Sequence, residues 1–243
     1  MMDTSVISTL PRPQKYTASV VSKDKVSAKV YLARFSLVDP PTITFLAGQN
    51  IMIQVGDGVN RSMSIASLPR EQESVLIAHD ISPMGPGSRH MIDLEVGDTV
   101  RFIGPLGMFV LDTRQRRHKV FLATGTGIAP FRSMIWDYLE KGGTDEIHLY
   151  WGVRYAEDIF WREELEDLAR RFKNFYYLLT LSQPSDTWRG KSGRVTDHIS
   201  MSANLPASTD YYLCGNKQMV YDVGAFLFDR HVPKEHIKTE LFY

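Results

Sequence analysis

Four short segments of the sequence contain residues that can bind an anion. Three of them also contain turn-forming glycines, and the fourth contains three serines. The segments are RSMSIAS at 61–67, GPGS at 85–88, TGTGIAP at 124–130 and YYLCGNKQMV at 211–220. Glycine lets the backbone turn sharply and approach a phosphate, and the free N–H groups at the start of a helix favour negative charge. Arginine and serine add hydrogen bonds to phosphate oxygens. The chemistry indicated is the binding of phosphorylated ligands.

The segment 124–130 follows an apolar run and precedes a helical pattern that has Pro130 in its first turn. Gly125 and Gly127 allow the backbone to approach a pyrophosphate, and proline suits the first turn of a helix. The third glycine of the usual dinucleotide fingerprint is absent. An ordinary turn between a strand and a helix is therefore an equal alternative at this position.

The segment 211–220 is also a strand that leads through a glycine into a helix. In an open α/β sheet, ligands bind at the carboxyl ends of the strands, so this turn is expected on the same side as Gly125. Cys214 is either an ordinary small buried residue or a thiol that faces the ligand. Both alternatives stay open.

The two segments of the first half offer further anion contacts. Strand alternation over 61–67 places Arg61 and Met63 on one face and Ser62 and Ser64 on the other. Arg61 either binds a phosphate or pairs with a carboxylate, while a serine hydroxyl offers a short donor to a planar ligand. Ser88 is expected to cap a short helix over 88–94, whose first amides form a second anion site.

The elements that must position these residues change in type along the chain. From residue 15 to about 112, short β-like runs are separated by Gly, Pro and Asp, at 16–21, 29–37, 43–55, 61–67, 74–81 and 98–104. They predict a small antiparallel β-barrel. After the polar stretch 112–119, apolar strands alternate with helical patterns, the strands at 120–124, 147–153, 175–181 and 211–215 and the helices at 129–141, 156–172 and 217–230. This alternation predicts a doubly wound α/β domain with a parallel sheet, so we expect two domains, 15–112 and 118–243.

Composition excludes several classes of protein. With 243 residues, 43% hydrophobic and 23% charged, the chain is not disordered. The 28 basic residues balance the 28 acidic residues, which argues against a nucleic-acid partner. No apolar run is long enough to span a membrane, and the N-terminal segment lacks the features of a targeting peptide. A cytoplasmic location is therefore expected.

The single cysteine and the spacing of the seven histidines limit metal chemistry. Cys214 alone forms neither an intramolecular disulfide nor a four-thiolate iron–sulfur cluster within this chain. The histidines show no spacing typical of metal ligands, and His79, His118 and His148 are interpreted as surface or strand residues. We therefore predict no metal site.

These segments, in this order, resemble the ferredoxin–NADP reductase superfamily, from about residue 15 to Tyr243. The matching motifs are FLAGQ (45–49), RSMS (61–64), GPGS (85–88), GPLGMF (104–109), GTGIAP (125–130), WGVR (151–154), SQPSDTWRGKSG (182–193), CGNKQM (214–219) and the aromatic C-terminus. The resemblance implies a flavin-binding barrel followed by a nicotinamide-binding α/β domain. It also implies FAD as cofactor and NADH or NADPH as substrate.

On the flavin side, the resemblance implies cofactor binding by residues of the first half: Arg61, Ser62, Met63, Ser64, Gly87 and Ser88. Arg61 contacts the flavin phosphate and Ser64 hydrogen-bonds near flavin N5 in this scheme. Gly87 and Ser88 bind the pyrophosphate. Met63 replaces the aromatic residue usual in this motif, so a softer thioether contact takes the place of ring stacking.

On the nicotinamide side, the resemblance implies nucleotide binding by residues of the second half: Gly125, Thr126, Gly127, Pro130, Cys214, Gly215 and Met219. Cys214 and Gly215 flank the nicotinamide ring in this scheme. Tyr243 covers the flavin face, and Glu240 assists proton transfer although it lies three residues before the terminus. Ser64, Cys214, Glu240 and Tyr243 are the residues expected at the reacting atoms.

Nucleotide preference is expected to favour NADH. Ser182 is followed by Gln183, where NADPH-specific members of the resembled family carry an arginine for the 2′-phosphate. The bidentate contact of an arginine is lost with glutamine. Arg154 and Arg189 are alternative ligands of that phosphate.

The resemblance implies that hydride passes between nicotinamide C4 and flavin N5, about 3–3.5 Å apart. The electrons then go to a separate acceptor, which is ferredoxin, flavodoxin or a small molecule. Two alternatives are a reductase of free flavin and a non-catalytic flavin-binding electron-transfer subunit. We expect a monomer, and the basic cluster Arg114, Arg116, Arg117 and Lys119 either docks an acidic carrier or is a solvated linker.

Overall fold

The computed structural model describes residues 11–201 and 208–242. The chain divides into two compact units. The first runs to Leu111 and includes Arg132–Asp137 from a later helix, and the second comprises Asp112–Phe131 and the chain from Tyr138 onward. No helix of the described residues is both long and apolar enough to cross a membrane.

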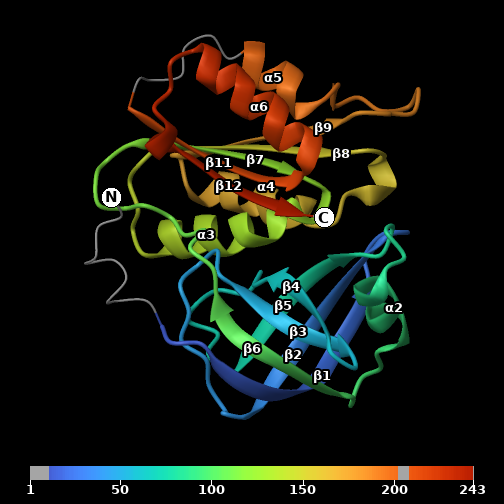
Figure 1. Cartoon of the computed structure of the whole chain (residues 1–243). Helices are drawn as coiled ribbons and strands as arrows, with labels where there is room; N and C mark the ends of the chain where they lie inside the picture. The colour runs from blue at the N-terminus through green and yellow to red at the C-terminus, as the bar shows by residue number, and fades with distance from the viewer. Residues whose placement is uncertain (1–10, 202–207, 243) are drawn as a thin grey trace. The chain divides into compact units, whose positions relative to one another are not determined.

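The first unit is a curled antiparallel sheet with strand order β4-β3-β6-β1-β2-β5 (Figure 1). Its strands are β1 (Gln14–Lys25), β2 (Val30–Asp39), β3 (Asn50–Gly56), β4 (Val59–Ser64), β5 (Ser74–Asp80) and β6 (Thr99–Leu106). Beyond the end of β4, the Ala66 amide donates to Leu76 O on β5 at 2.8 Å, and the Leu76 amide donates to Ser67 Oγ at 3.1 Å. These bonds join the two edges of the sheet into a barrel.

Strand alternation fills the inside of this barrel with apolar side chains. Ala33 and Ile53 are 0% exposed, and they lie in one cluster with neighbours from β1 to β6. The predicted run 43–55 is only partly a strand, because residues 43–49 form a loop that turns at Gly48 with φ +98°. A Cβ at Gly48 would lie 2.2 Å from Phe109 O, so the loop packs tightly against the backbone.

Helix α2 (Pro86–Asp93) begins two residues earlier than the predicted helix over 88–94. Proline suits the first position of a helix, and Gly85 is the N-cap without a side-chain capping bond. The prediction that Ser88 caps this helix is therefore wrong, since Ser88 is a buried residue within the first turn. At the other end, Lys23 Nζ donates to Ile92 O and Leu94 O, each at 2.6 Å.

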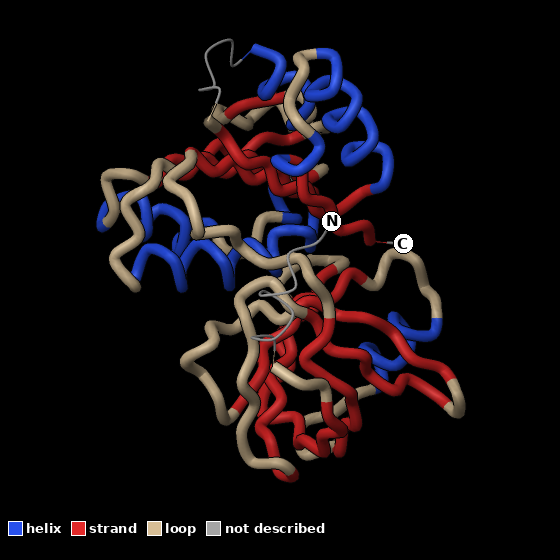
Figure 2. Tube along the Cα trace, turned by 60° about the vertical axis from the view of Figure 1, so that its left-hand side comes forward, coloured by secondary structure: helices blue, strands red, loops and turns tan. Residues whose placement is uncertain are grey.

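The second unit is a parallel sheet with strand order β10-β9-β8-β7-β11-β12. Its strands are β7 (His118–Thr124), β8 (Ile147–Val153), β9 (Phe175–Leu181), β10 (Lys191–Ser192), β11 (Thr209–Asn216) and β12 (Ile237–Phe242). Helices α3 (Ile128–Glu140) and α4 (Arg162–Arg171) lie on one face, and α5 (Val195–Met201) and α6 (Lys217–Asp229) on the other (Figures 1 and 2). The predicted fold class, an antiparallel barrel followed by a doubly wound parallel sheet, is confirmed.

Some element boundaries in the second unit differ from the prediction. The helix expected over 156–172 is a 3-10 turn, η2 (Ala156–Asp158), followed by the shorter α4. Phe160 leaves the helical path because its ring packs edge-on against Trp151 and Trp161, with centroid distances of 5.2 and 4.9 Å. Helix α5 and strands β10 and β12 were not predicted.

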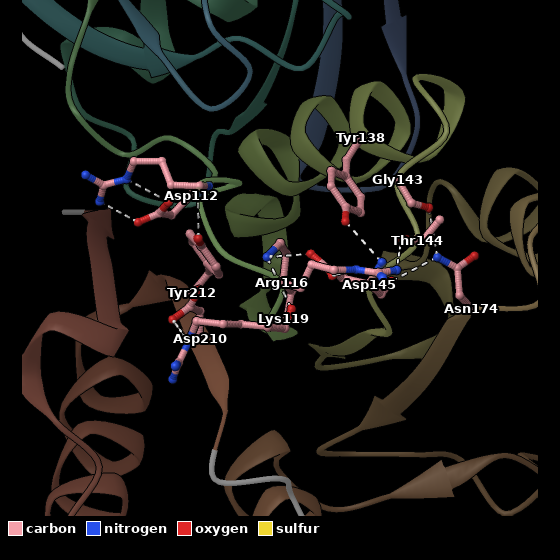
Figure 3. Close-up of polar contacts among 12 residues, drawn as sticks. Asp112, Arg116, Lys119, Tyr138, Gly143, Thr144, Asp145, Asn174, Asp210 and Tyr212 are labelled. Carbon is pink, nitrogen blue, oxygen red and sulfur yellow. Dashed lines mark hydrogen bonds and ion pairs between the residues drawn. The ribbon is translucent and has the colours of Figure 1, made fainter. Parts of the chain in front are cut away.

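A set of ion pairs holds the amino ends of the central strands (Figure 3). Lys119 is 0% exposed, with Nζ 3.1 Å from Asp145 Oδ2, and Arg117 Nε lies 2.9 Å from Asp210 Oδ1. The same Asp210 oxygen bonds His236 Nδ1 at 2.8 Å. Lys119 and Arg117 are therefore structural residues, and neither alternative for the basic cluster, a docking site or a solvated linker, describes these two side chains.

Candidate functional site

The carboxyl ends of β7 and β11 lie side by side in the second unit, with Ala123 of β7 opposite Cys214 of β11. From β7 the chain goes to β8 and β9 on one side, whereas β11 and β12 lie on the other side. This is the switch point at which α/β sheets bind ligands. The 3-10 turn η1 (Gly125–Gly127) follows β7 there.

The glycines at this switch point are required by close backbone contacts. A Cβ at Gly127 would lie 2.3 Å from Cys214 O and 2.8 Å from the Cα of Gly215. Gly215 has φ +130°, and a Cβ on it would lie 2.4 Å from Thr124 Oγ1. Gly125, at φ +54°, has no atom within 4 Å of its Cβ position. The η1 backbone is thus packed against β11 on one side and open on the other, as a phosphate cradle requires.

The sequence analysis did not identify three residues of this site, which are Thr124, Trp151 and Asn216. The Asn216 amide donates to Thr124 Oγ1 at 2.8 Å, and the Asn216 side chain accepts from Gln218 N at 2.9 Å to cap α6. Trp151 Nε1 donates to Gly125 O at 3.0 Å. An asparagine just before a helical pattern could have predicted the N-cap. The hydrogen bonds of Thr124 and Trp151 go to residues distant in the sequence, so no local pattern predicts them.

Cys214 is 0% exposed. Burial raises the pKa of its thiol well above the usual range, and the nearby Glu240 carboxylate shifts it in the same direction. The thiol is therefore protonated at neutral pH. Strand β12 places Glu240 opposite Cys214 in the parallel ladder, while Tyr243 lies outside the described residues.

The other predicted nucleotide residues lie close to these turns in the chain. Thr126 and Pro130 are buried, in η1 and in the first turn of α3 respectively. Met219 is 6% exposed in the first turn of α6. The structure thus places these residues, together with Gly125, Gly127 and Gly215, around the ends of two neighbouring strands.

In the first unit, β4 carries four of the predicted flavin residues. Arg61 and Met63 lie opposite Ile53 and Ile51 of the barrel core, as the predicted alternation requires. Met63 is buried at 5% exposure within that core, and Ser64 is equally buried. Ser62 is exposed.

Helix α2 brings a second glycine turn close to Arg61. A Cβ at Gly87 would lie 3.3 Å from Arg61 Cγ and 3.4 Å from His79 Cε1, so three elements meet there. Arg61 is exposed and donates to Asn60 O at 2.8 Å, and it has no carboxylate partner among the described residues. Among the described residues, no carboxylate pairs with Arg61, so phosphate binding stays the prediction for this side chain.

The donors present in each unit fit a phosphorylated cofactor. A guanidinium, an imidazole and the uncapped amides of α2 are donors, which match pyrophosphate oxygens. In the part of the chain that the structure describes, no cluster of His, Cys, Asp and Glu is arranged to hold a metal ion. These residues fit FAD in the first unit, and the η1 turn fits a nicotinamide dinucleotide in the second.

Comparison with known families assigns each unit. Residues 17–111 match the model of the oxidoreductase FAD-binding domain. Residues 121–224 match the model of the oxidoreductase NAD-binding domain. The two matched ranges contain the two glycine turns described above.

Individual proteins show similarity over most of the chain. Ferredoxin–NADP reductase B of Sorangium cellulosum is 32% identical over 239 residues, covering 94% of this chain and 98% of that protein. The electron transfer component of anthranilate 1,2-dioxygenase from Acinetobacter baylyi is 33% identical over 202 residues, covering 82% of this chain but 59% of its own length. The chain therefore spans only part of that second relative.

Solved structures share the fold. The Amycolatopsis cytochrome P450 reductase GcoB superposes with a TM-score of 0.88 at 27% identity, covering 96% of this chain and 71% of that one. A Neisseria gonorrhoeae ferredoxin NADP+ reductase with bound FAD and NADP has the same fold, with a TM-score of 0.79 at 21% identity and coverage of 96% and 100%. With the two domain models and the full-length relative, these findings establish that the chain belongs to the ferredoxin–NADP reductase superfamily and is an FAD-dependent NAD(P)H oxidoreductase.

Proposed function

We propose that this chain oxidises NADH with FAD held in its first unit and delivers the electrons to a separate ferredoxin-type protein. The observation that carries the proposal is the pair of glycine turns, Gly87 beside Arg61 in one unit and Gly125–Gly127 beside Gly215 in the other. Bound FAD supplies the redox chemistry. Hydride transfer between two cofactors needs no nucleophile–base pair of the protein. The role of the chain is therefore to bind and orient the two dinucleotides.

In the flavin unit, Arg61 and the first turn of α2 at Gly87 and Ser88 bind phosphate. The absence of a carboxylate beside Arg61 among the described residues leaves its charge available for that role. We propose that Ser62 and Met63 also bind FAD. We assign the hydrogen bond near flavin N5 to the Ser64 hydroxyl.

In the nucleotide unit, Gly125, Thr126 and Gly127 bind the nicotinamide dinucleotide at the start of α3. Pro130 and Met219 shape the turns on either side of the switch point. Cys214 and Gly215 flank the nicotinamide, with the thiol as a neutral group since its pKa is raised by burial. The register places Glu240 next to Cys214, which supports a role for this carboxyl in proton transfer. The proposed covering role of Tyr243 concerns a residue outside those described.

The NADH preference rests on the loop after β9. The Ser182 and Gln183 amides donate to Val153 O and Arg154 O at 3.0 and 2.9 Å, so the loop backbone is held close to β8. Gln183 is exposed and uncharged. Arg189 Nη1 donates to Asp186 O at 2.7 Å and Trp188 O at 3.2 Å, which occupies that nitrogen within its own turn.

The ferredoxin-type acceptor is proposed from the relatives. One is named as a ferredoxin–NADP reductase and another as a dioxygenase electron transfer component. The single cysteine supports an acceptor outside this chain, because an iron–sulfur cluster needs several thiolates. We also propose that the protein works as a monomer in the cytoplasm, where NADH is available; gel filtration and cell fractionation test these two points.

Anaerobic reduction tests the proposal. The FAD-loaded protein is mixed with NADH or NADPH, and the loss of flavin absorbance is followed by stopped flow. We expect both nucleotides to bleach the flavin and NADH to do so faster. Failure of both to reduce a fully loaded protein would overturn the assigned reaction, and faster reduction by NADPH would overturn the preference.

Acceptor assays separate the downstream possibilities. Reduction of cytochrome c that depends on added ferredoxin supports the proposed acceptor. Turnover of free flavin at the same rate without ferredoxin supports the free-flavin alternative instead. Binding of FAD without reduction by either nucleotide is the result expected for a non-catalytic subunit.

A further inference from the structure

His79 ends the row of inward-facing residues on β5. Strand alternation places it after Val75 and Ile77, which are 0% exposed and belong to the core of the first unit. It lies opposite Tyr31 of β2, whose ring also packs against that core. The polar imidazole of His79 therefore lies at the end of the row of apolar side chains that fill the barrel.

The Nε2 atom of His79 is buried and has no hydrogen-bond partner among the described residues. Leaving a buried polar atom unpaired costs free energy, so such atoms in folded proteins are almost always bonded to protein, water or a ligand. Sequence reasoning interpreted His79 as a surface or strand residue. The unpaired, buried Nε2 atom can be recognised only in the structure, and it indicates that His79 binds a ligand.

The surroundings of Nε2 indicate what its partner is. A Cβ at Gly87 would lie 3.6 Å from Nε2 and 3.3 Å from Arg61 Cγ, so the side of this glycine that lacks a Cβ faces both side chains. Gly87 is the second residue of α2, whose first turn has no side-chain cap. The Arg61 side chain, the imidazole and the first turn of α2 thus meet at Gly87. The donors that these three elements carry match a phosphate.

We propose that His79 is a phosphate-binding residue of the flavin site, with Nε2 donating a hydrogen bond to the FAD pyrophosphate beside Arg61 and the first turn of α2. The inference rests on the proposed function for the identity of the cofactor. The pyrophosphate of a nicotinamide dinucleotide has the same chemistry, so NADH binding to the FAD-loaded protein is titrated in addition to the flavins.

The charges that face His79 make this contact dependent on pH. Burial lowers the pKa of His79, Asp80 on its own strand raises it, and His90 on α2 lowers it. Arg61 of β4 adds another positive group, and the uncharged Gly87 and the ring of Tyr31 on β2 complete the surroundings. The imidazole of the FAD-free protein is therefore neutral at pH 7.

A bound pyrophosphate favours the charged imidazolium and raises the pKa of His79 above its value in the free protein. FAD binding then takes up a proton at pH values between these two pKa values. The affinity for FAD should rise as pH falls through the pKa of the complex, and level off below the pKa of the free protein.

The test compares three flavins on FAD-free wild type and on His79→Phe, which keeps a ring but removes the donor. FAD, FMN and riboflavin are titrated by flavin fluorescence between about pH 5.5 and pH 8.5, the range in which histidine titrates. We expect His79→Phe to bind FAD about tenfold more weakly at pH 7, from the loss of one charge-assisted hydrogen bond, and to lose the pH dependence. Riboflavin, which carries no phosphate, should bind equally to both proteins.

Two further variants separate a phosphate contact from a packing role. His79→Gln keeps an N–H donor that does not titrate, so it should recover part of the affinity but not the pH dependence. His148→Gln changes a histidine of the second unit and should match wild type in every flavin titration. Thermal unfolding of the FAD-free proteins checks that each variant is folded.

Several results would overturn the inference: wild-type FAD affinity in His79→Phe, an equal loss for riboflavin, or a change confined to NADH binding by the loaded protein. If His79→Phe does not fold, long-range 1H–15N spectra of the wild-type imidazoles test the inference instead. A His79 Nε2 signal that does not change when FAD is added would also overturn the inference. A wild type that binds no FAD overturns the proposed function as well. FAD binding that depends on His79, without reduction by NAD(P)H, supports the inference and overturns only the proposed reaction.

Discussion

The backbone amide of Asn216 donates a 2.8 Å hydrogen bond to the Thr124 side chain, which joins the carboxyl ends of β11 and β7. The Asn216 side chain in turn caps α6 through Gln218 N. The same Thr124 Oγ1 packs against Gly215, where a Cβ would lie 2.4 Å away. One hydroxyl therefore aligns both glycine turns of the nucleotide site.

Thr124→Val keeps the shape of the side chain but removes the hydroxyl acceptor. The Asn216 amide then loses its partner, which should lower the free energy of unfolding by about 1 kcal/mol. NADH affinity should weaken several-fold because the two turns are no longer held in register. Urea unfolding and NADH titration of the loaded protein measure the two effects. Thr124→Ser retains the acceptor and should behave as wild type, and equal losses in both variants would contradict this explanation.

Gly127→Ala should be among the most disruptive single changes at the site. The added Cβ would lie 2.3 Å from Cys214 O, and backbone atoms have little freedom to move away. We expect a loss of stability of several kcal/mol, at the upper end of single-mutant effects, and loss of NADH binding. Urea unfolding and nucleotide titration check both expectations.

Gly224→Ala is the matched control, because it adds the same methyl group in α6 where no atom lies within 4 Å. Alanine favours a helix interior over glycine by roughly 1 kcal/mol, so this variant should be slightly stabilised. A similar response of both glycines to alanine would show that the close approach at Gly127 is unimportant.

The sequence was informative where local rules decide the structure. Alternation over 61–64 placed Arg61 and Met63 on one face of β4, and their cross-strand partners Ile53 and Ile51 share that face. The glycine before α3 marked the end of β7. It was uninformative where burial depends on distant partners. The Lys119 ammonium looks like a solvated charge in a polar stretch, yet Asp145 and Tyr138 from other elements surround it. Strand β12 has a mixed polar pattern and exists through its parallel ladder with β11.

Lys119→Met should destabilise the second unit strongly. The side chain is 0% exposed and pairs with Asp145, which is 8% exposed, so its loss leaves a buried carboxylate with one fewer cation. Removing one partner of a buried ion pair costs about 3–5 kcal/mol. Arg116→Ala is the control, since Arg116 is 81% exposed and 3.9 Å from the same carboxylate, and it should change the free energy of unfolding little. Urea unfolding of the three proteins compares them, and equal effects would contradict the assignment of Lys119 as the main partner.

Acid should weaken the fold through Asp112. The hydrogen bond from Arg114 lowers the pKa of this carboxyl from 3.8 to about 2, against the opposing effect of burial. A depressed carboxyl pKa stabilises the folded state above its unfolded pKa, and this contribution is lost as pH falls from about 4 to about 2. Asp112→Asn should therefore lower stability at pH 7 and reduce the dependence of stability on pH over that range. Thermal unfolding at several pH values tests this, and an unchanged acid dependence would count against the role of Asp112.

Gln183→Arg should shift the enzyme toward NADPH. The backbone of Gln183 is held by its 2.9 Å bond to Arg154 O, and its side chain is exposed, so an arginine at this position can reach a 2′-phosphate without disturbing the loop. A guanidinium forms charge-assisted, bidentate contacts with phosphate, which should raise kcat/KM for NADPH about tenfold while that for NADH changes little. Gln183→Glu is the opposite control, because its carboxylate repels the 2′-phosphate and should lower only the NADPH value. Steady-state kinetics with both nucleotides measure the change, and parallel shifts for NADH and NADPH would show that residue 183 does not face the 2′ position.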